Sequence, residues 1–419
     1  MNEKYPYQVS HLSLENLTTP TLFDTENQGI YLIFWWKEIP LGHGIFDPNT
    51  RVSENDFNNK LIESIIPTLE FYFSKQNSLK NCNWELMILE GRIKDWEACM
   101  ENLFSPWTTA AFPAQVPISV VICTRNRSND LKRCLDSIMK MDSLPAEIII
   151  IDNAPKDEST AELVKNFEKV KYFKEPRPGL SFARNRGVLE STHSIIAFTD
   201  DDVEVHKDWA FRVWETFGSN EKLFAITGLV LPKELKTSAQ VVFEKSWTFN
   251  RGYKDKEYDA TYWEKTLSIG PPVWKIGAGA NMAFKKEIFE SLGLFDVKLG
   301  AGASGCSEDS EMWYRILNHN YELAYCPRAV VLHKHRHKMN ELKSQIFQYM
   351  KGHVVAALVQ QGQNKKAGYT KYIYYKLPRY YLNKILHKSK NFGRNLKSVW
   401  NEINGIQAGI SFYFKYYKN

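Results

Sequence analysis

Three consecutive carboxylates, Asp200, Asp201 and Asp202, stand at the end of the apolar run Ile195–Phe198, which has the length of a buried strand. Adjacent carboxylates repel one another and lose water at the end of a buried strand, so a cation is expected between them. A hard divalent ion, Mg²⁺ or Mn²⁺, takes oxygen ligands of this kind and shares them with substrate phosphates. For the triplet by itself, a solvated acidic turn is the alternative interpretation.

The elements around the triplet predict a parallel α/β sheet. Apolar runs alternate with segments of helical periodicity, and the expected strands are 118–123, 147–152, 171–173 and 194–199, with helices from Ser128, Thr160 and Ser181. Such alternation is typical of a mostly parallel, Rossmann-like sheet with helices on both faces. Ligands bind beyond the carboxyl ends of such strands. Three of these ends carry polar clusters, at 124–127, 152–153 and 200–202, which favours the metal interpretation.

Three units are expected along the chain. Residues 113–340 form the α/β domain, with a nucleotide-binding half at 113–205 and an acceptor half at 206–340. Residues 1–112 are predicted to be a small α+β accessory unit with strands at 29–37 and 39–46 and a helix capped by Ser53. The proline-rich stretch 105–117 is the expected linker. Residues 341–419 are expected to be a helical extension.

Charge and composition indicate which partners and which cellular location to expect. Residues 334–419 carry 17 Lys and Arg side chains against two acids, Glu341 and Glu402, and aromatic residues interleave with the cations beyond Gly368. This pattern favours an anionic surface as partner, and we expect residues 369–419 to rest on the inner face of a membrane. A solvated helical extension or an oligomer contact is the alternative. The sequence contains no run of about 18 apolar residues, so no membrane-spanning helix is predicted. The start has no apolar signal core, and the six cysteines lie far apart, so a reduced cytoplasmic protein is expected.

Several stretches of residues 117–340 together resemble family 2 of the glycosyltransferases, nucleotide-sugar enzymes of the GT-A fold. They are Val121–Arg127, Ile151–Asn153, Gly179–Gly187, Phe198–Asp202, Gly277–Phe284, Phe295–Asp296, Ser307–Ser310 and Val331–His333. The resemblance implies an inverting, metal-dependent glycosyltransferase that moves a sugar from a nucleotide donor, with UDP as the expected nucleotide. It implies a glycan or lipid-linked acceptor, in the synthesis of a bacterial surface polysaccharide.

The donor side of the expected site is built from the strand ends. The resemblance and the placement of the side chains assign nucleotide-sugar binding to Thr124, Arg127, Asp152, Arg184, Asp200 and Asp201. A carboxylate can accept a base N–H, and a guanidinium can bind a diphosphate or ribose. Asp202 is expected to bind Mn²⁺ or Mg²⁺, since the triplet corresponds to the D-x-D motif of the family.

His333, His335 and His337 alternate after the expected strand 329–332, so they would share one face if that strand continued. His333 is predicted as the metal contact on this side, with His335 as the alternative. A solvated basic hinge without a metal role is the third interpretation.

The acceptor side is expected in the second half of the domain. The resemblance makes Asp309 the general base that takes the proton of the acceptor hydroxyl, with Glu308 and Asn281 beside it. The small-residue run Gly277–Ala280 lets a backbone approach a ligand, or it simply packs closely. Capping of a helix by Ser307 is a structural alternative for the acidic pair 308–309.

Two other classes of function share single features with this sequence. A sugar-phosphate nucleotidyltransferase shares this sheet but normally needs a glycine-rich loop at the first strand end, which Thr124–Arg127 lacks. A nucleic-acid-binding protein could use the basic, aromatic tail, but it does not account for the acidic strand ends. We therefore expect no nucleic acid among the partners.

Overall fold

The computed structural model describes residues 6–17, 22–76, 82–108, 111–386 and 396–418. Its central strands are β6 (Gln115–Thr124), β7 (Leu144–Asn153), β8 (Val170–Glu175), β9 (Ile195–Asp200), β10 (Val203–Val205), β11 (Leu223–Pro232), β12 (Lys256–Tyr258), β13 (Asn281–Lys285) and β14 (Glu322–His333). The helices around them are α4 (Ser128–Ile138), α5 (Ser159–Val164), α6 (Leu180–Glu190), α7 (Trp209–Ser219), α8 (Ser238–Trp247), α9 (Ala260–Leu267), α10 (Glu287–Leu292) and α11 (Glu308–Asn318).

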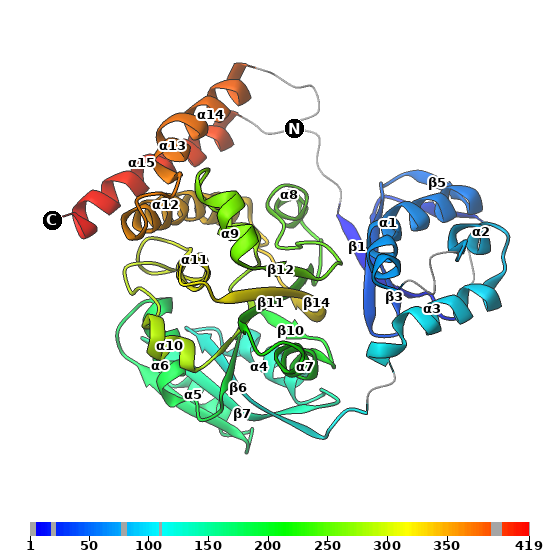
Figure 1. Cartoon of the computed structure of the whole chain (residues 1–419), viewed down its shortest axis with the longest axis horizontal. Coiled ribbons are helices and arrows are strands. Elements are labelled where there is room, and N and C mark those ends of the chain that lie inside the picture. Colours follow the sequence, from blue (N-terminus) through cyan, green and yellow to red (C-terminus); the bar gives the residue numbers. More distant parts are fainter. Residues whose placement is uncertain (1–5, 18–21, 77–81, 109–110, 387–395, 419) are drawn as a thin grey trace.

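These strands form one sheet in the order β10-β14-β11-β13-β9-β6-β7-β8, with β12 paired to β14 (Figure 1). Strands β6, β7, β8, β9, β11 and β14 run in one direction, and β10, β12 and β13 run against them. The prediction of a mostly parallel α/β sheet is confirmed. The expected helix at 160–169 is shorter than predicted and ends at Val164.

Helices cover both faces of the sheet, because the apolar side chains of each strand alternate between them. Val120 and Ile122 of β6 pack with α4 and α7, whereas Val121 packs in the cluster that contains Ala183 of α6. A Cβ on Gly187 would lie 2.3 Å from Val121 Cγ1, so the small residues of α6 allow this helix to sit close to the sheet.

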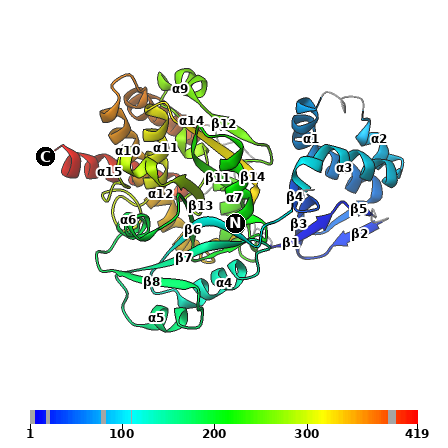
Figure 2. The same ribbon diagram turned by 60° about the horizontal axis from the view of Figure 1, so that its bottom comes forward.

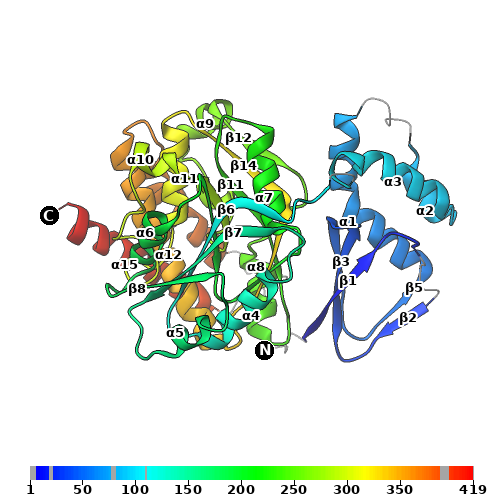
Figure 3. The same cartoon turned by 90° about the horizontal axis from the view of Figure 1, so that it is seen from below.

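The N-terminal unit is a separate lobe beside the sheet (Figure 3). It contains β1 (Tyr7–Ser13), β3 (Gly29–Trp36) and β4 (Ile39–Phe46) in one small sheet, the pair β2 (Leu22–Thr25) and β5 (Thr50–Ser53), and helices α1 (Glu54–Lys75), α2 (Trp84–Leu89) and α3 (Ile93–Thr108). Ser53 caps α1 in a reciprocal capping box with Asp56, as the sequence predicts.

Two expectations for this unit change. The predicted linker 105–117 is mostly structured, because α3 extends to Thr108 and β6 begins at Gln115; residues 109–110 lie outside the described residues. The expectation that the cysteines are unpaired is wrong for Cys82 and Cys99, which form a disulfide. Sequence reasoning missed it because the two cysteines are 17 positions apart in the chain, and only the packing of α3 brings them together.

The N-terminal lobe lies beside the large sheet domain (Figure 2), and hydrogen bonds join the two. Tyr7 pairs with Leu235 as an isolated β-bridge. Tyr72 Oη donates to Asp255 at 2.9 Å, and Arg328 binds the same carboxylate at 2.8 Å. A cavity of about 540 Å³ lies between the two parts, and its walls include Tyr31, His43, Glu244 and Tyr253.

The C-terminal part is helical, as expected. It consists of α12 (Met339–Gln363), α13 (Tyr369–Lys371), the π-helical turn Tyr372–Lys376, α14 (Leu377–Leu386) and α15 (Leu396–Tyr417). Helix α15 packs along α12, since a Cβ on Gly405 or Gly409 would lie 2.6 Å from Phe347 O or Lys351 O. Residues 387–395 of the expected tail lie outside the described residues. Within the described ranges, no helix is both long and apolar enough to cross a membrane.

Candidate functional site

The register of the sheet brings the predicted residues to one edge. Strands β6 and β9 run parallel with Cys123 opposite Asp200, so Thr124 and the triplet lie beyond neighbouring strand ends. Strand β10 pairs antiparallel to β14 with Val203 opposite His333, which carries the histidine to Asp202. Residues 200–202 and residue 333, more than 130 positions apart in the chain, meet because β10 and β14 are neighbours.

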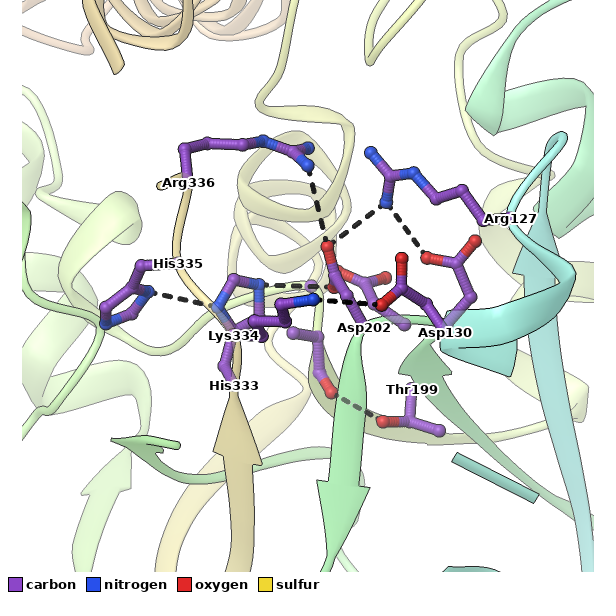
Figure 4. Close-up of polar contacts among 12 residues, drawn as sticks. Arg127, Asp130, Thr199, Asp202, His333, Lys334, His335 and Arg336 are labelled. Carbon is purple, nitrogen blue, oxygen red and sulfur yellow. Dashed lines mark hydrogen bonds and ion pairs between the residues drawn. The ribbon is translucent and has the colours of Figure 1, made fainter. Parts of the chain in front are cut away.

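Basic side chains surround Asp202 (Figure 4). Arg127 Nη1 lies 3.1 Å from Asp202 Oδ2, Arg336 Nη1 lies 3.8 Å from the same atom, and His333 Nε2 lies 3.4 Å from Asp202 Oδ1. Burial raises the pKa of Asp202, but its interactions with His333, Arg127 and Arg336 outweigh burial and lower it overall. Asp202 is therefore ionised at neutral pH.

Asp200, Asp202 and His333 form a group that fits a divalent cation. One ligand atom from each of the three lies within 4.8 Å of the others. Burial lowers the pKa of His333 to about 4, so its imidazole is neutral and has a lone pair for a metal. Two carboxylates and a neutral imidazole suit Mn²⁺ or Mg²⁺. The structure thus places Asp200, predicted to bind the nucleotide, among the possible metal ligands.

Asp201 points elsewhere. Thr124 Oγ1 donates to Asp201 Oδ2 at 2.7 Å, and Arg127 Nη1 lies 3.0 Å from Asp201 Oδ1. Burial, together with the charge of Asp202, raises the pKa of Asp201 to about 7. The carboxylate ties the end of β6 to the triplet, and the hydroxyl of Thr124 is engaged in the same contact.

Asp152 is fully buried at the end of β7. Tyr172 Oη donates to Oδ2 at 2.9 Å, and burial raises the pKa of this carboxyl group. Its Oδ1 is buried and has no hydrogen-bond partner among the described residues. Because an unmatched buried oxygen is costly, a ligand donor such as a base N–H would satisfy it.

Arg184 lies under the site rather than open to it, with a side chain only 3% exposed. It pairs with Glu308, lies 3.6 Å from Asp200 Oδ1 and donates to Gly279 O at 3.2 Å. A Cβ on Gly279 would lie 2.7 Å from Arg184 Nη2 and 3.1 Å from Asp309 Oδ2. Gly279 therefore makes room for these two side chains.

Glu308 and Asp309 begin helix α11. Ser307 precedes them with φ +75°, a left-handed conformation that is strained for serine, and its side chain makes no capping hydrogen bond. The capping alternative is therefore not observed. Burial raises the pKa of Glu308 to about 7, although Arg184 lowers it. Asp309 is half-buried, and its Oδ1 accepts from the N–H of Ser310 at 2.6 Å.

Asn281, predicted on the acceptor side, is used inside the protein. Its amide donates to Leu229 O at 3.0 Å and to Ala329 O at 2.8 Å, and its Oδ1 accepts from Trp209 Nε1 at 2.9 Å. With its side chain buried and both donors occupied, Asn281 joins the strands β11, β13 and β14 to helix α7. The amide of Asn281 therefore has no N–H left to donate to an acceptor sugar.

Sequence reasoning missed two features of the site. Arg336 reaches Asp202 from the histidine-rich stretch, and the alternation of basic residues from His333 onward was the available signal. Strand β14 ends at His333, yet His335 still contacts His333, with 3.1 Å between the Nδ1 atoms. His337 instead pairs with Glu234 at 2.7 Å.

Comparison with known proteins identifies the domain that carries this site. The family model described as glycosyl transferase family 2 matches residues 119–293. Residues 119–293 are a family 2 glycosyltransferase domain. The matched residues include part of β6, all of β7 and the Asp200–Asp202 triplet, whereas the helix of Asp309 and the strand of His333 follow them.

Relatives of this chain include named enzymes. A poly-β-1,6-N-acetyl-D-glucosamine synthase of Staphylococcus epidermidis is 26% identical over 51% of this chain and 48% of its own length. A glucosyl-dolichyl phosphate glucuronosyltransferase of Haloferax volcanii is 23% identical over 44% of this chain and 57% of its own. The chain thus spans about half the length of these curated relatives.

A solved structure, a mannosyltransferase of Pyrobaculum calidifontis in complex with GDP-mannose and Mn²⁺, covers 74% of this chain and 91% of its own. Its TM-score is 0.47 and its identity 16%, so it does not bear on the donor or the metal of this chain.

Proposed function

We propose that this protein is a metal-dependent, inverting glycosyltransferase that transfers a sugar from a UDP-sugar to a hydroxyl group of a glycan or lipid-linked acceptor. The observation that carries the proposal is the group of Asp200, Asp202 and His333 at the carboxyl edge of the sheet, in which the two aspartates belong to the family 2 domain. A divalent cation held by this group supplies positive charge beside the leaving diphosphate.

The donor is expected between the ends of β6, β7 and β9. Asp152 offers its unmatched buried Oδ1 to a base N–H. Arg127, which contacts both Asp201 and Asp202 and is 35% exposed, is the basic side chain best placed to reach a phosphate. Arg184 acts from below by holding Asp200 and Glu308 in position.

Asp309 is proposed as the general base. It is half-buried, and its Oδ2 would lie 3.1 Å from a Cβ on Gly279. A carboxylate that takes the proton of the attacking hydroxyl allows direct displacement of the diphosphate. One displacement without a covalent intermediate inverts the anomeric centre. The names of the relatives, which include a polysaccharide synthase and a transferase for a dolichyl-phosphate-linked sugar, support an acceptor of the glycan or lipid-linked class.

The C-terminal helices are proposed to rest on an anionic membrane surface. Tyr374, Tyr375 and Tyr380 are each more than half exposed, and Lys371, Lys376 and Arg379 lie exposed among them. Tyrosine favours the membrane–water interface, and basic residues are attracted to anionic lipids. The family 2 domain would then meet a lipid-linked acceptor at the cytoplasmic face of the membrane, where a bacterial surface polysaccharide is assembled.

Calorimetric titration of UDP into the protein in Mn²⁺ and in EDTA tests the core of this proposal. We expect UDP to bind at least about 10-fold more tightly with Mn²⁺, equivalent to about 1.4 kcal/mol. Asp202→Ala should abolish the difference, whereas Asp136→Ala, which removes an exposed carboxylate on α4, should leave it intact. Titrations of GDP and ADP decide the base. Equal affinity for UDP in Mn²⁺ and EDTA in the unaltered protein would overturn the metal assignment.

A further inference from the structure

A row of side chains leads away from the proposed metal ligands into the protein. His333 Nε2 faces Asp202 Oδ1 at 3.4 Å, and His333 Nδ1 lies 3.1 Å from His335 Nδ1 (Figure 4). His335 Nε2 in turn lies 3.1 Å from Glu244 Oε2 on helix α8. The three residues of the row beyond Asp202 are buried: His333 is 8%, His335 4% and Glu244 8% exposed.

The chemistry of each contact fixes which atom carries a proton. An ionised carboxylate only accepts hydrogen bonds, so His335 donates to Glu244 through Nε2–H. A neutral His335 then has a lone pair on Nδ1, and the short contact between the two Nδ1 atoms requires His333 to donate through its own Nδ1–H. This leaves the lone pair of His333 on Nε2, the atom that faces Asp202.

From this row we propose that Glu244 and His335 are positioning residues that hold His333 in the Nδ1–H tautomer, with the Nε2 lone pair aimed at the metal position. The proposal deepens the proposed function, because it rests on the metal site of Asp200, Asp202 and His333. In this arrangement the lone pair of His333 opposes the carboxylate oxygen of Asp202. Two acceptors at 3.4 Å repel each other until a cation lies between them.

The surroundings hold the row in place. The ring of Phe243 lies 4.6 Å from that of His335, and the ring of Phe249 lies 5.3 Å from that of His333, measured between centroids. Each imidazole is therefore packed against a phenyl ring. Partners behind a ligating histidine orient its ring and fix its tautomer, and their loss typically lowers metal affinity about 10–100-fold.

Glu244, at the end of the row farthest from Asp202, contacts residues of the sheet domain and of the N-terminal lobe. Thr248 Oγ1 donates to Glu244 Oε1 at 2.9 Å, and Tyr31 Oη of the N-terminal lobe reaches the same oxygen at 3.4 Å. Glu244 therefore has three hydrogen-bond partners, Thr248, Tyr31 and His335. The small N-terminal sheet in this way contributes a contact to the row that ends at the metal position.

Nitrogen NMR of the histidine rings tests the tautomer directly. The full-length protein is labelled with ¹⁵N-histidine and recorded without metal at pH 8, and His333 is assigned from the signal lost in His333→Gln. We expect a protonated Nδ1 and an unprotonated Nε2 for His333 in the unaltered protein. A protonated Nε2 would overturn the proposal, since it means that His335 is an imidazolium that donates from both nitrogens.

Substitution of His335 gives the second measurement, with Mn²⁺ affinity read from the paramagnetic resonance of free Mn²⁺. His335→Phe should lose the single tautomer of His333 and weaken Mn²⁺ binding about 10–100-fold. His335→Gln, which keeps one donor and one acceptor, should lose less. His337→Gln is the matched control, because His337 pairs with Glu234 outside the row.

The outcomes separate this proposal from the proposed function. An unchanged tautomer and unchanged Mn²⁺ affinity in His335→Phe would refute the positioning role even if UDP binding depends on metal. Absence of metal-dependent UDP binding in the unaltered protein would instead refute the proposed function, and the tautomer measured without metal would still stand.

Discussion

Arg184 and Glu308 form a buried ion pair that joins helix α6 to the first turn of helix α11. The same guanidinium reaches Asp200 at 3.6 Å, so one side chain links the acidic triplet to the acidic pair 308–309. The two halves of the domain, one predicted for the donor and one for the acceptor, are therefore connected by this ion pair. Each of its charged groups is buried against the opposite charge of the other.

Removal of Arg184 should destabilise the protein strongly. Arg184→Ala leaves Glu308 buried without its cation, and breaking such a pair costs about 3–5 kcal/mol. Arg186→Ala is the matched control on the same helix, because Arg186 pairs with Glu190 near the surface and should cost about 0–1 kcal/mol. Urea unfolding curves of the two variants measure the difference; equal losses would mean that the pair contributes no more than a surface one.

Asp309→Asn should abolish transfer without abolishing donor binding. The amide has nearly the same size but cannot take a proton, so the transfer rate should fall about 10²–10⁴-fold. Rates with a UDP-sugar and calorimetric titration of UDP give the two quantities, and Asp136→Asn controls for loss of one carboxylate. A variant that keeps most of its activity would move the base elsewhere, with Glu308 the next residue to examine.

Gly279→Ala should damage the site through a single methyl group. The new Cβ would lie 2.7 Å from Arg184 Nη2 and 3.1 Å from Asp309 Oδ2, so both side chains have to shift. A shift of about 1 Å near the reacting groups costs about 10²-fold in rate. Gly218→Ala in helix α7, where a Cβ has nothing within 4 Å, should leave the rate unchanged. Similar rates for the two variants would show that Gly279 only packs.

Glu147 should make the free energy of unfolding depend on pH in the acidic range. Burial raises its pKa, but hydrogen bonds from Lys171, Ser119 and the N–H of Thr192 outweigh burial and lower it to about 2. A lowered carboxyl pKa stabilises the fold fully above the unfolded value near 4.5, and this stabilisation disappears as the pH falls toward 2. Glu147→Gln should therefore lose about 1–3 kcal/mol at pH 7, with the gap to the unaltered protein closing below pH 4.5. Urea unfolding across this range would contradict the prediction if the gap stayed constant.

Liposome co-sedimentation tests the tail. Deletion of residues 369–419 is a poor variant, because Tyr369 is fully buried and α15 packs on α12. A triple substitution of Tyr374, Tyr375 and Tyr380 by Ser changes only exposed side chains. The unaltered protein should sediment with anionic vesicles at low salt and less in high salt, and the triple variant should bind more weakly. If the unaltered protein does not sediment with anionic vesicles at low salt, the membrane proposal is excluded.

Local sequence determined the framework of this protein. Alternation of apolar runs with helical periodicity predicted β6, β7, β8, β9 and the helices between them, because burial on both faces of a parallel sheet imposes continuous apolar strands. The capping box at Ser53 and the long helix α12 also follow from neighbouring residues alone. The sequence also nominated Asp202 and His333 as candidate metal ligands, because a carboxylate and an imidazole at strand ends suit a divalent cation.

Tertiary structure decided which of the nominated side chains face a ligand. Asn281 and Arg184 have suitable chemistry, yet their donors are occupied by backbone carbonyls or by Glu308, and such partners come from distant strands and helices. Asp201 differs from its neighbours in the same way, because Thr124 and Arg127 turn it from the metal group. Glu244 and His335 are 91 positions apart, and no local pattern connects them. Hydrogen-bond partners brought together by sheet pairing fix the direction of each polar group, and that direction cannot be derived from the order of residues.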